Sequence, residues 1–360
     1  MTIGILGGGQ LGRMLALAAY PLGEFISIFD PDGDCCAGHV APVFKAGFGD
    51  TSALEAWAKA CKVVTFESEN IAGEVLQTVQ RHTTVAPGLV SLTISQDRLL
   101  EKQRLRDLGI DTMPFAAVDS LADLQQALGN IGIPAVLKTR RGGYDGKGQR
   151  IIRSPDDAEA AFNALGRRNL IVEGFAAFSR EVSIVGVRGV DGDEVIYPLT
   201  ENEHRDGILR TSRNLVGDPL HAEAEHKIRR LMTDLGHVGA LALELFDVQG
   251  RLIANEIAPR VHNTGHWTIE GAETSQFENH VRAITGRHLG VTETRGYCAM
   301  VNFIGSTPDL DKLLALPGVH AHFYGKTGRP GRKVGHATVV AASAQARDDA
   351  VAGINRLLAA

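Results

Sequence analysis

The chain has 360 residues, of which 44% are hydrophobic and 22% are charged, and its net charge is −5. This length and composition predict two or three packed domains and exclude long disordered segments, and the acidic balance argues against polymeric nucleic acid as a partner. No basic leader precedes the first apolar segment and no apolar run reaches the roughly 20 residues that span a bilayer, so we expect a cytoplasmic protein without membrane contact.

Strands and helices alternate over the first hundred residues. We expect apolar strands at 3–6, 25–29 and 63–66, and helices at 10–20, 52–60 and 72–80. Such alternation predicts a parallel sheet that is covered by helices on both faces.

The pattern changes near Asp97. A charged helix is expected at 98–108, and the strands beyond it are longer and arranged as hairpins. These strands are expected at 135–139, 149–153, 169–173, 180–188, 194–198, 208–214, 240–247 and 251–258, with one long helix at 220–235. A final block from about 291 holds a strand at 298–304, a basic turn at 325–335, a further strand and a closing helix. The middle of the chain is therefore α+β with antiparallel sheets.

A glycine-rich turn follows the first strand. Gly7–Gly12 has the pattern G-x-G-x-x-G, and Asp30 ends the next strand. This context fits a dinucleotide-binding turn, but its glycines and helix N-terminus suit any phosphorylated ligand. An NAD-binding oxidoreductase is one interpretation, a phosphate site for another ligand is a second, and a tight turn without a ligand is a third.

A second glycine-rich segment follows a strand that ends in Lys138. It carries four glycines within seven residues, flanked by Arg140, Arg141 and Lys147. Backbone N–H groups in such a loop can close over a polyphosphate. We expect a flexible cationic flap, and an idle hairpin is the alternative.

Two carboxylates follow on the arms of one expected hairpin. A three-residue loop would place Glu244 and Glu256 on the same sheet face, and with Asn255 they suit magnesium that is shared with phosphates. Solvated surface glutamates are the alternative. His262 and His266 are four residues apart, but Gly265 argues against a helical zinc motif, so we expect a polar substrate loop there.

Longer strings narrow these interpretations. GGGQLGRML, RRGGYDGKGQ, YPLTENEHRDGILRTS and RPGRKVGH resemble N5-carboxyaminoimidazole ribonucleotide synthetases of the ATP-grasp superfamily, and the resemblance runs from Ile3 to about His336. It implies an ATP-grasp fold of α/β and α+β type: a Rossmann-like domain over 1–97 with the substrate phosphate loop, an ATP-grasp domain over 98–290, and a small C-terminal domain over 291–360 that closes the cleft.

The implied reaction joins bicarbonate to the amine of 5-aminoimidazole ribonucleotide, with ATP and Mg2+, through carboxyphosphate. The resemblance also implies a homodimer. A formate- or glycine-adding purine ligase of the same superfamily is the alternative enzyme, and the Tyr144-Asp145 and His262–Trp267 strings argue against it.

The resemblance also assigns roles to residues. Glu173 begins the segment that meets the adenine, and Glu181 fits an acceptor for a ribose hydroxyl. The implied ATP-site residues are Arg98, Lys138, Gly143, Tyr144, Asp145, Gly146, Lys147, Gly148, Gln149, Glu173, Gly174, Phe175, Ala176, Glu181, His204, Asn255 and Glu256. The substrate-side candidates are Gly9, Gln10, Leu11, Tyr144, Asp145, Arg260, His262, Asn263, Arg332 and Lys333. Glu244 and Glu256 are the metal candidates, and the catalytic candidates are Lys138, Tyr144, Asp145, Arg260, His262 and Asn263.

Overall fold

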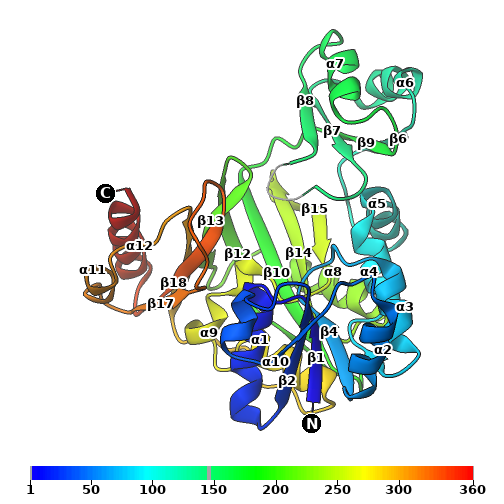
Figure 1. Cartoon of the computed structure of the whole chain (residues 1–360). Helices are drawn as coiled ribbons and strands as arrows, with labels where there is room; N and C mark the ends of the chain where they lie inside the picture. Colours follow the sequence, from blue (N-terminus) through cyan, green and yellow to red (C-terminus); the bar gives the residue numbers. More distant parts are fainter. Residues whose placement is uncertain (1, 144–146, 360) are drawn as a thin grey trace.

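The first ninety-odd residues form a parallel sheet with helices on both faces, as predicted (Figure 1). The computed structural model of the chain describes residues 2–143 and 147–359. The elements of this part are β1 (Thr2–Leu6), α1 (Gln10–Ala19), η1 (Tyr20–Leu22), β2 (Phe25–Asp30), η2 (Cys36–His39), β3 (Val43–Lys45), α2 (Thr51–Lys59), β4 (Val63–Phe66), α3 (Gly73–Gln80), β5 (Thr84–Val85) and α4 (Leu89–Gln96). The strand order is β3-β2-β1-β4-β5, and all pairs are parallel.

The next segment builds a small lobe that stands away from the rest of the protein (Figure 1). Helix α5 (Arg98–Asp107) still packs on the body, against α4 and β15. The lobe beyond it consists of β6 (Phe115–Val118), α6 (Leu121–Ile131), β7 (Ala135–Thr139), β8 (Gln149–Ile152), α7 (Asp157–Ala164) and β9 (Leu170–Gly174). The four strands form an antiparallel sheet in the order β6-β9-β7-β8. Because β7 and β8 are neighbours, the glycine-rich flap joins two adjacent strands, as expected.

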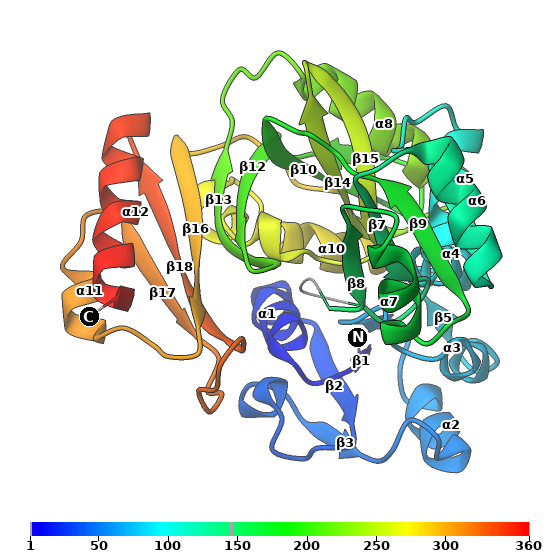
Figure 2. The same ribbon diagram turned by 90° about the horizontal axis from the view of Figure 1, so that it is seen from above.

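The remaining strands form one large antiparallel sheet, best seen from above in Figure 2. Its elements and their helices are β10 (Arg180–Arg188), β11 (Glu194–Ile196), β12 (Thr200–Arg205), β13 (Ile208–Asn214), α8 (His221–Asp234), β14 (Gly239–Val248), β15 (Arg251–Ala258), η3 (Asn263–Gly265), α9 (Thr268–Gly271), α10 (Gln276–Ile284), β16 (Tyr297–Ile304), α11 (Leu310–Leu314), β17 (Val319–Phe323), β18 (Lys333–Ala341) and α12 (Ala344–Ala359). No helix among the described residues has the length and apolar character needed to cross a membrane.

The C-terminal strands continue the sheet of the central domain. β16 pairs with β13, and Thr211 lies opposite Val301. The expected C-terminal domain therefore shares its sheet with the middle of the chain, although α12 packs on β16 and β18 over a hydrophobic cluster that includes Phe303, Leu313 and Ile354. The boundaries at 97/98 and 290/291 remain proposals.

The hairpin of β14 and β15 turns more tightly than expected. The strands are joined by two residues, Gln249 and Gly250, whose φ angles are 55° and 79°. Positive φ at both positions is typical of the two-residue turn that matches the twist of antiparallel strands. The prediction that Glu244 and Glu256 share one sheet face agrees with the structure, because Glu244 lies directly opposite Glu256.

Two buried histidines join the first domain to the start of β14. The backbone N–H of Ala240 donates to His280 Nδ1 at 3.0 Å, so the Nε2–H of His280 donates to Thr65 Oγ1 at 2.9 Å. His237 Nε2 lies 3.0 Å from the carbonyl oxygen of Ala240, and its Nδ1 accepts from Ser91 Oγ at 2.9 Å. Neutral imidazoles of His237 and His280 therefore link the first domain to β14; we call these two residues the histidine joint.

We expect the histidine joint to make the stability of the fold fall at acidic pH. Burial lowers the pKa of His237 to about 4 and that of His280 to about 3. An unfolded histidine takes up its proton near pH 6.5, so the stability these groups contribute is full above that pH and is lost as the pH falls toward the folded values. For the pair, the free energy of unfolding should fall by about 3 kcal/mol between pH 6.5 and 5.

Urea unfolding at several pH values measures this loss. In His280→Gln, which keeps a donor and an acceptor without titrating, the decline between pH 6.5 and 5 should be shallower than in the wild type. Equal slopes would contradict the assignment.

Candidate active site

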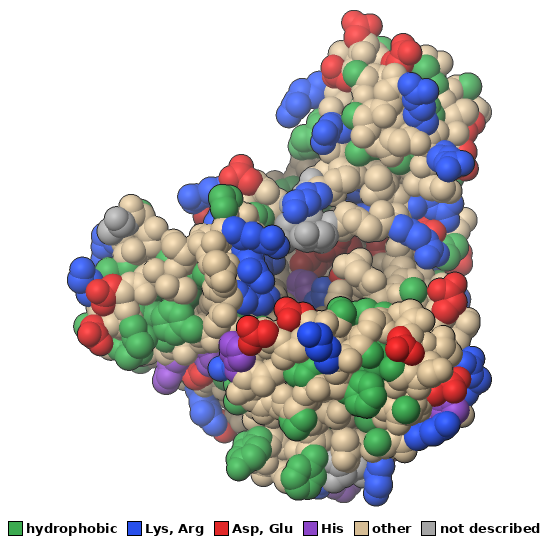
Figure 3. Space-filling model, viewed as in Figure 1, with side chains coloured by type: hydrophobic (Ala, Val, Ile, Leu, Met, Phe, Trp, Pro, Cys, Tyr) green, Lys and Arg blue, Asp and Glu red, His purple; other side chains and the backbone are tan. Residues whose placement is uncertain are grey.

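A cleft of about 460 Å³ lies between the small lobe and the body of the protein. Figure 3 shows it as a hollow that contains acidic and basic side chains. Gln10 from α1, Lys138 from β7, Glu256 from β15 and Lys333 from β18 all line it. Residues from every part of the chain therefore meet at one place.

Most of the predicted site residues lie in this cleft. They are Gln10, Leu11, Arg98, Lys138, Gly143, Lys147, Gln149, Glu173, Gly174, Phe175, Ala176, Glu181, His204, Glu244, Asn255, Glu256, Arg260, His262, Asn263 and Lys333. Among the predicted residues that the structure describes, Gly9, Gly148 and Arg332 do not line the cleft. Tyr144, Asp145 and Gly146 lie outside the described residues.

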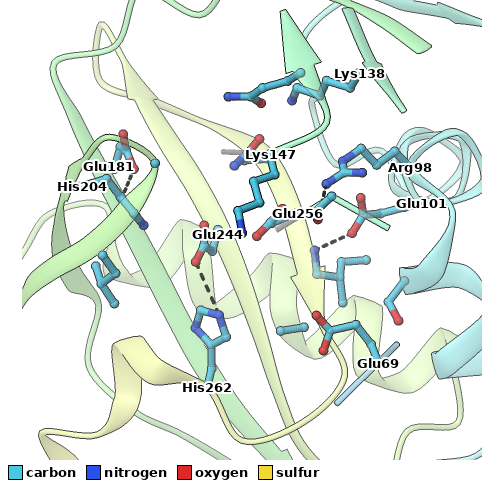
Figure 4. A pocket seen from close by; sticks show the side chains of 18 of the residues that line it. Glu69, Arg98, Glu101, Lys138, Lys147, Glu181, His204, Glu244, Glu256 and His262 are labelled. Carbon is cyan, nitrogen blue, oxygen red and sulfur yellow. Dashed lines mark hydrogen bonds and ion pairs between the residues drawn. The ribbon is translucent and has the colours of Figure 1, made fainter. Parts of the chain in front are cut away.

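The two candidate metal carboxylates face each other across β14 and β15 (Figure 4). Burial, and then the nearby Glu256, raise the pKa of Glu244 to about 8. His262 Nε2 lies 3.6 Å from Glu244 Oε1. A divalent cation between the carboxylates would relieve both causes of the raised pKa, so this donor set fits magnesium held together with phosphate oxygens. The described residues contain no cluster of three or more histidine, cysteine or acidic side chains able to hold a metal alone.

Opposite this pair, Glu181 and His204 form a contact of 2.5 Å between Oε2 and Nδ1. Burial acts to lower the pKa of His204, but the hydrogen bond to Glu181 and the charge of Glu244 raise it overall. Figure 4 also shows Lys147 reaching from the flap toward Glu244 and Glu256. The flap lysine and the carboxylates therefore share one space, as the flap hypothesis requires.

Glu173 is held between two lysines. Its carboxylate oxygens lie 3.2 Å from Lys102 Nζ and 3.2 Å from Lys138 Nζ. Burial alone would raise the pKa of Glu173, but the two lysines lower it to about 2. The Glu173 carboxylate thus fixes the ammonium group of Lys138, and the following residues, Gly174 to Ala176, also line the cleft.

Three arginines fix the base of the flap. Arg140 donates to both carboxylate oxygens of Asp97 at 2.9 and 2.7 Å, and Arg141 donates to the same side chain at 3.3 Å. Arg98 donates to the carbonyl oxygens of Thr139 and Gly143, each at 2.9 Å. Arg140 and Arg141 therefore fix the base of the flap, whereas Lys147, which was predicted to be an ATP-site residue, lines the cleft.

The first glycine loop holds a carboxylate of the protein itself. The N–H groups of Gly9 and Gly12 donate to Glu67 at 2.6 and 2.9 Å, and Gly8 N–H donates to Asp30 at 2.7 Å. An added Cβ at Gly9 would lie 2.4 Å from Glu67 Oε1. Glu67 therefore accepts from the amides at this helix N-terminus, and a ligand phosphate at Gly7–Gly12 stays a prediction.

The basic turn before β18 reaches the first domain. Lys326 Nζ donates to Gln10 Oε1, and Lys333 lines the cleft. Arg332 instead donates to the carbonyl oxygen of Thr327 at 3.1 Å. Lys326 was missed in the sequence, although it lies in the predicted basic turn.

Other residues of the site were missed because they lie outside the recognised strings. Glu69 pairs with Arg260, with one contact of 2.9 Å, and both side chains line the cleft. Glu101 and Lys102 lie in a helix whose charges resemble those of a solvated surface, yet they are 2% and 1% exposed. Phe178 stacks on Phe246 at 4.6 Å between ring centroids, and both line the cleft.

Three parts of the chain match known domains in order. Residues 1–96 match the ribonucleotide synthetase preATP-grasp domain, residues 103–277 the ATP-grasp domain, and residues 298–350 the phosphoribosylaminoimidazole carboxylase C-terminal domain. These matches confirm the predicted fold class.

Whole-chain relatives agree with them. The N5-carboxyaminoimidazole ribonucleotide synthase of Pseudomonas aeruginosa is 49% identical over 100% of both chains. The crystal structure of the synthetase from Thermus thermophilus superimposes with a TM-score of 0.95 at 48% identity, covering 99% of this chain and 98% of that one. The synthase from Aspergillus clavatus, in complex with ADP and 5-aminoimidazole ribonucleotide, gives 0.92 at 29% identity over 99% and 98% of the two chains. This chain belongs to the N5-carboxyaminoimidazole ribonucleotide synthase family.

Proposed function

We propose that this protein carboxylates the exocyclic amine of 5-aminoimidazole ribonucleotide with bicarbonate, consuming ATP. The observation that carries this proposal is the full-length similarity to a relative whose structure holds both ADP and 5-aminoimidazole ribonucleotide. The cleft of this chain supports it, because it combines paired carboxylates, lysines and an apolar aromatic wall in one space. The products are N5-carboxyaminoimidazole ribonucleotide, ADP and phosphate.

The nucleotide lies between the lobe and the large sheet in this proposal. Phe178, Phe246 and residues 174–176 offer an apolar wall for a base, and the Glu181–His204 pair offers acceptors for ribose hydroxyls. Arg98, Lys138 and Lys147 supply positive charge for the phosphates. Glu244 and Glu256, with Asn255, hold magnesium, which when bound neutralises phosphate charge.

The chemistry proceeds in two steps without a covalent protein nucleophile. A bicarbonate oxygen attacks the γ-phosphorus of ATP, ADP leaves, and carboxyphosphate forms. The amine of the ribonucleotide then forms a bond to the carboxyl carbon, phosphate leaves, and the amine loses a proton. Lys138 and Arg98 stabilise the charge on the transferring group by fixed position. Burial and then Arg260 hold the pKa of His262 well below the usual value, so His262 presents a neutral imidazole to the cleft, with Nε2 3.6 Å from Glu244 Oε1.

Two lysines near the first glycine loop offer a position for the substrate phosphate. Glu67 occupies the amides of the first glycine loop, whereas Lys326 and Lys333 approach the same side of the cleft from the C-terminal turn. We place the substrate phosphate near these two lysines, with Gln10 and Leu11 at the adjoining helix start. This arrangement keeps the substrate between the first and last parts of the chain.

A cytoplasmic homodimer completes the proposal. Cys35, Cys36, Cys61 and Cys298 are all free and buried, which suits a reducing compartment. Leu17, Tyr20 and Phe25 are large apolar side chains that are 49%, 84% and 72% exposed within one short segment, and such a surface suits contact with a second copy. Light scattering measures the mass that tests the dimer.

Phosphate release from ATP tests the reaction. We expect rapid release only when bicarbonate and 5-aminoimidazole ribonucleotide are both present, with one phosphate formed per carboxylated product. Release stimulated by formate or glycine with another ribonucleotide, and not by bicarbonate, would assign the chain to a different ligase activity.

A further inference from the structure

Helix α5 presents the adjacent, buried side chains of Glu101 and Lys102 to the outer edge of β15. This strand lies at one end of the large sheet, so along that edge no other described strand pairs with its backbone over residues 255–257. Glu101 Oε1 accepts the backbone N–H of Ile257 at 2.5 Å. Lys102 Nζ donates to the carbonyl oxygens of Asn255 at 2.6 Å and Ala254 at 3.3 Å. The two side chains therefore bind the backbone on both sides of Glu256.

The strand is irregular at the same point. Glu244 pairs with Glu256 and the next residue, Leu245, pairs with Ala254, so Asn255 is an extra residue in β15. Successive side chains of a regular strand point to opposite faces, whereas Asn255 and Glu256 both line the cleft. Bulges of this kind redirect side chains next to active sites. The bulge therefore lies at the point where β15 lines the cleft, and it restores the pairing of Glu256 with Glu244.

The burial of Glu101 and Lys102 makes their hydrogen bonds to β15 necessary. Both side chains are almost fully buried, and a buried polar group is costly unless it is hydrogen-bonded. Lys102 also lies 3.2 Å from Glu173, which in turn contacts Lys138. One turn earlier in the same helix, Arg98 binds the flap (Figure 4). Helix α5 thus connects the flap, the phosphate-side lysine and the bulge.

We propose that Glu101 and Lys102 are positioning residues that hold the β15 bulge and thereby set Asn255 and Glu256 for a magnesium-bound nucleotide. The inference rests on the proposed function, since it takes Glu244 and Glu256 as the magnesium carboxylates. Glu101 acts here as a hydrogen-bond acceptor for Ile257, and an uncharged oxygen in the same place can perform this role.

Calorimetric titration with ADP, in excess magnesium and in EDTA, tests the inference. Glu101→Met removes the acceptor, whereas Glu101→Gln keeps a carbonyl oxygen at the same distance along the side chain. Loss of a group that supports a metal ligand typically weakens metal binding by about 10- to 100-fold. We expect the Kd of ADP with magnesium to rise at least about tenfold in Glu101→Met and to stay within about twofold in Glu101→Gln. The Kd in EDTA should be unchanged in both.

Three further variants complete the experiment. Gln103→Met is exposed on the same helix and should bind like the wild type. A comparison of Lys102→Met, which loses the donor, with Lys102→Arg, which keeps one, repeats the test at the second side chain. This comparison tests the inference if Glu101→Met does not fold. Three results would overturn this inference alone, provided that magnesium strengthens ADP binding to the wild type. They are equal losses of affinity in Glu101→Gln and Glu101→Met, no loss in Glu101→Met or Lys102→Met, and a parallel loss in EDTA. No effect of magnesium on the wild type would overturn the proposed metal site, and this inference with it.

Discussion

Replacing Lys138 by alanine is expected to lower kcat by about two to three orders of magnitude, because it removes a fixed cation from the phosphate end of the nucleotide site. Lys138 is the penultimate residue of β7 and lines the cleft, with its ammonium group 3.2 Å from Glu173. The Lys138 side chain is 16% exposed, and this burial lowers its pKa. A cation in such surroundings interacts more strongly with phosphate oxygens than one in solvent.

The fold should survive this change. Glu173 keeps Lys102 at 3.2 Å, so its buried carboxylate retains a partner. Initial rates of phosphate release, with thermal unfolding measured in parallel, separate catalysis from stability. Lys59→Ala, an exposed change in α2, serves as the matched control. A rate for Lys138→Ala within about twofold of this control would remove Lys138 from the phosphate site.

The glycine loops show where sequence reasoning reaches its limit. The turn at Gly7–Gly12 places N–H donors at a helix N-terminus, as its composition predicts. Two of these donors bind the carboxyl group of Glu67, which lies 55 residues away from Gly12 along the chain. The sequence of the loop therefore predicts its N–H donors, whereas the acceptor that they bind depends on the packing of β4 beside β1.

The same distinction explains the flap and α5. Glycines and cations in one segment predicted a phosphate loop, but Arg140 and Arg141 turn to Asp97, 43 and 44 residues earlier. Glu101 and Lys102 sit in a helix that is charged along its whole length, and a charged helix is usually a solvated one. Their partners are backbone groups at the edge of β15, which only the tertiary fold places beside the helix. The element types followed from periodicity, since β4, β10, β13 and β15 begin and end at the predicted residues.

The hairpin carboxylates were predictable for a different reason. Their geometry follows from a short turn between two strands, which fixes register locally. The turn has two residues instead of three, and the added bulge at Asn255 keeps Glu244 opposite Glu256. A local error in loop length was thus offset by an irregularity that no periodicity reveals.

Glu256→Gln should separate function from stability at this hairpin. The amide is a poorer ligand than a carboxylate for a hard cation, so the magnesium concentration for half-maximal activity is expected to rise at least about tenfold. Glu256 is also one of the causes that raise the pKa of Glu244, so removing its charge relieves a repulsion between the two side chains. The melting temperature without magnesium is therefore expected to equal or exceed that of the wild type.

A magnesium titration of the reaction rate, and thermal unfolding in EDTA, measure the two effects. Glu203→Gln, at an exposed position of β12, controls for the loss of one negative charge and should change neither. An unchanged magnesium titration would show that Glu256 has a structural role only, and a lower melting temperature would support that interpretation. Paired carboxylates that repel each other persist in a fold when a ligand needs them, because active sites are where a local cost to stability is retained for function. Loss of magnesium dependence together with unchanged or greater stability is the outcome that distinguishes a metal site from a structural hairpin.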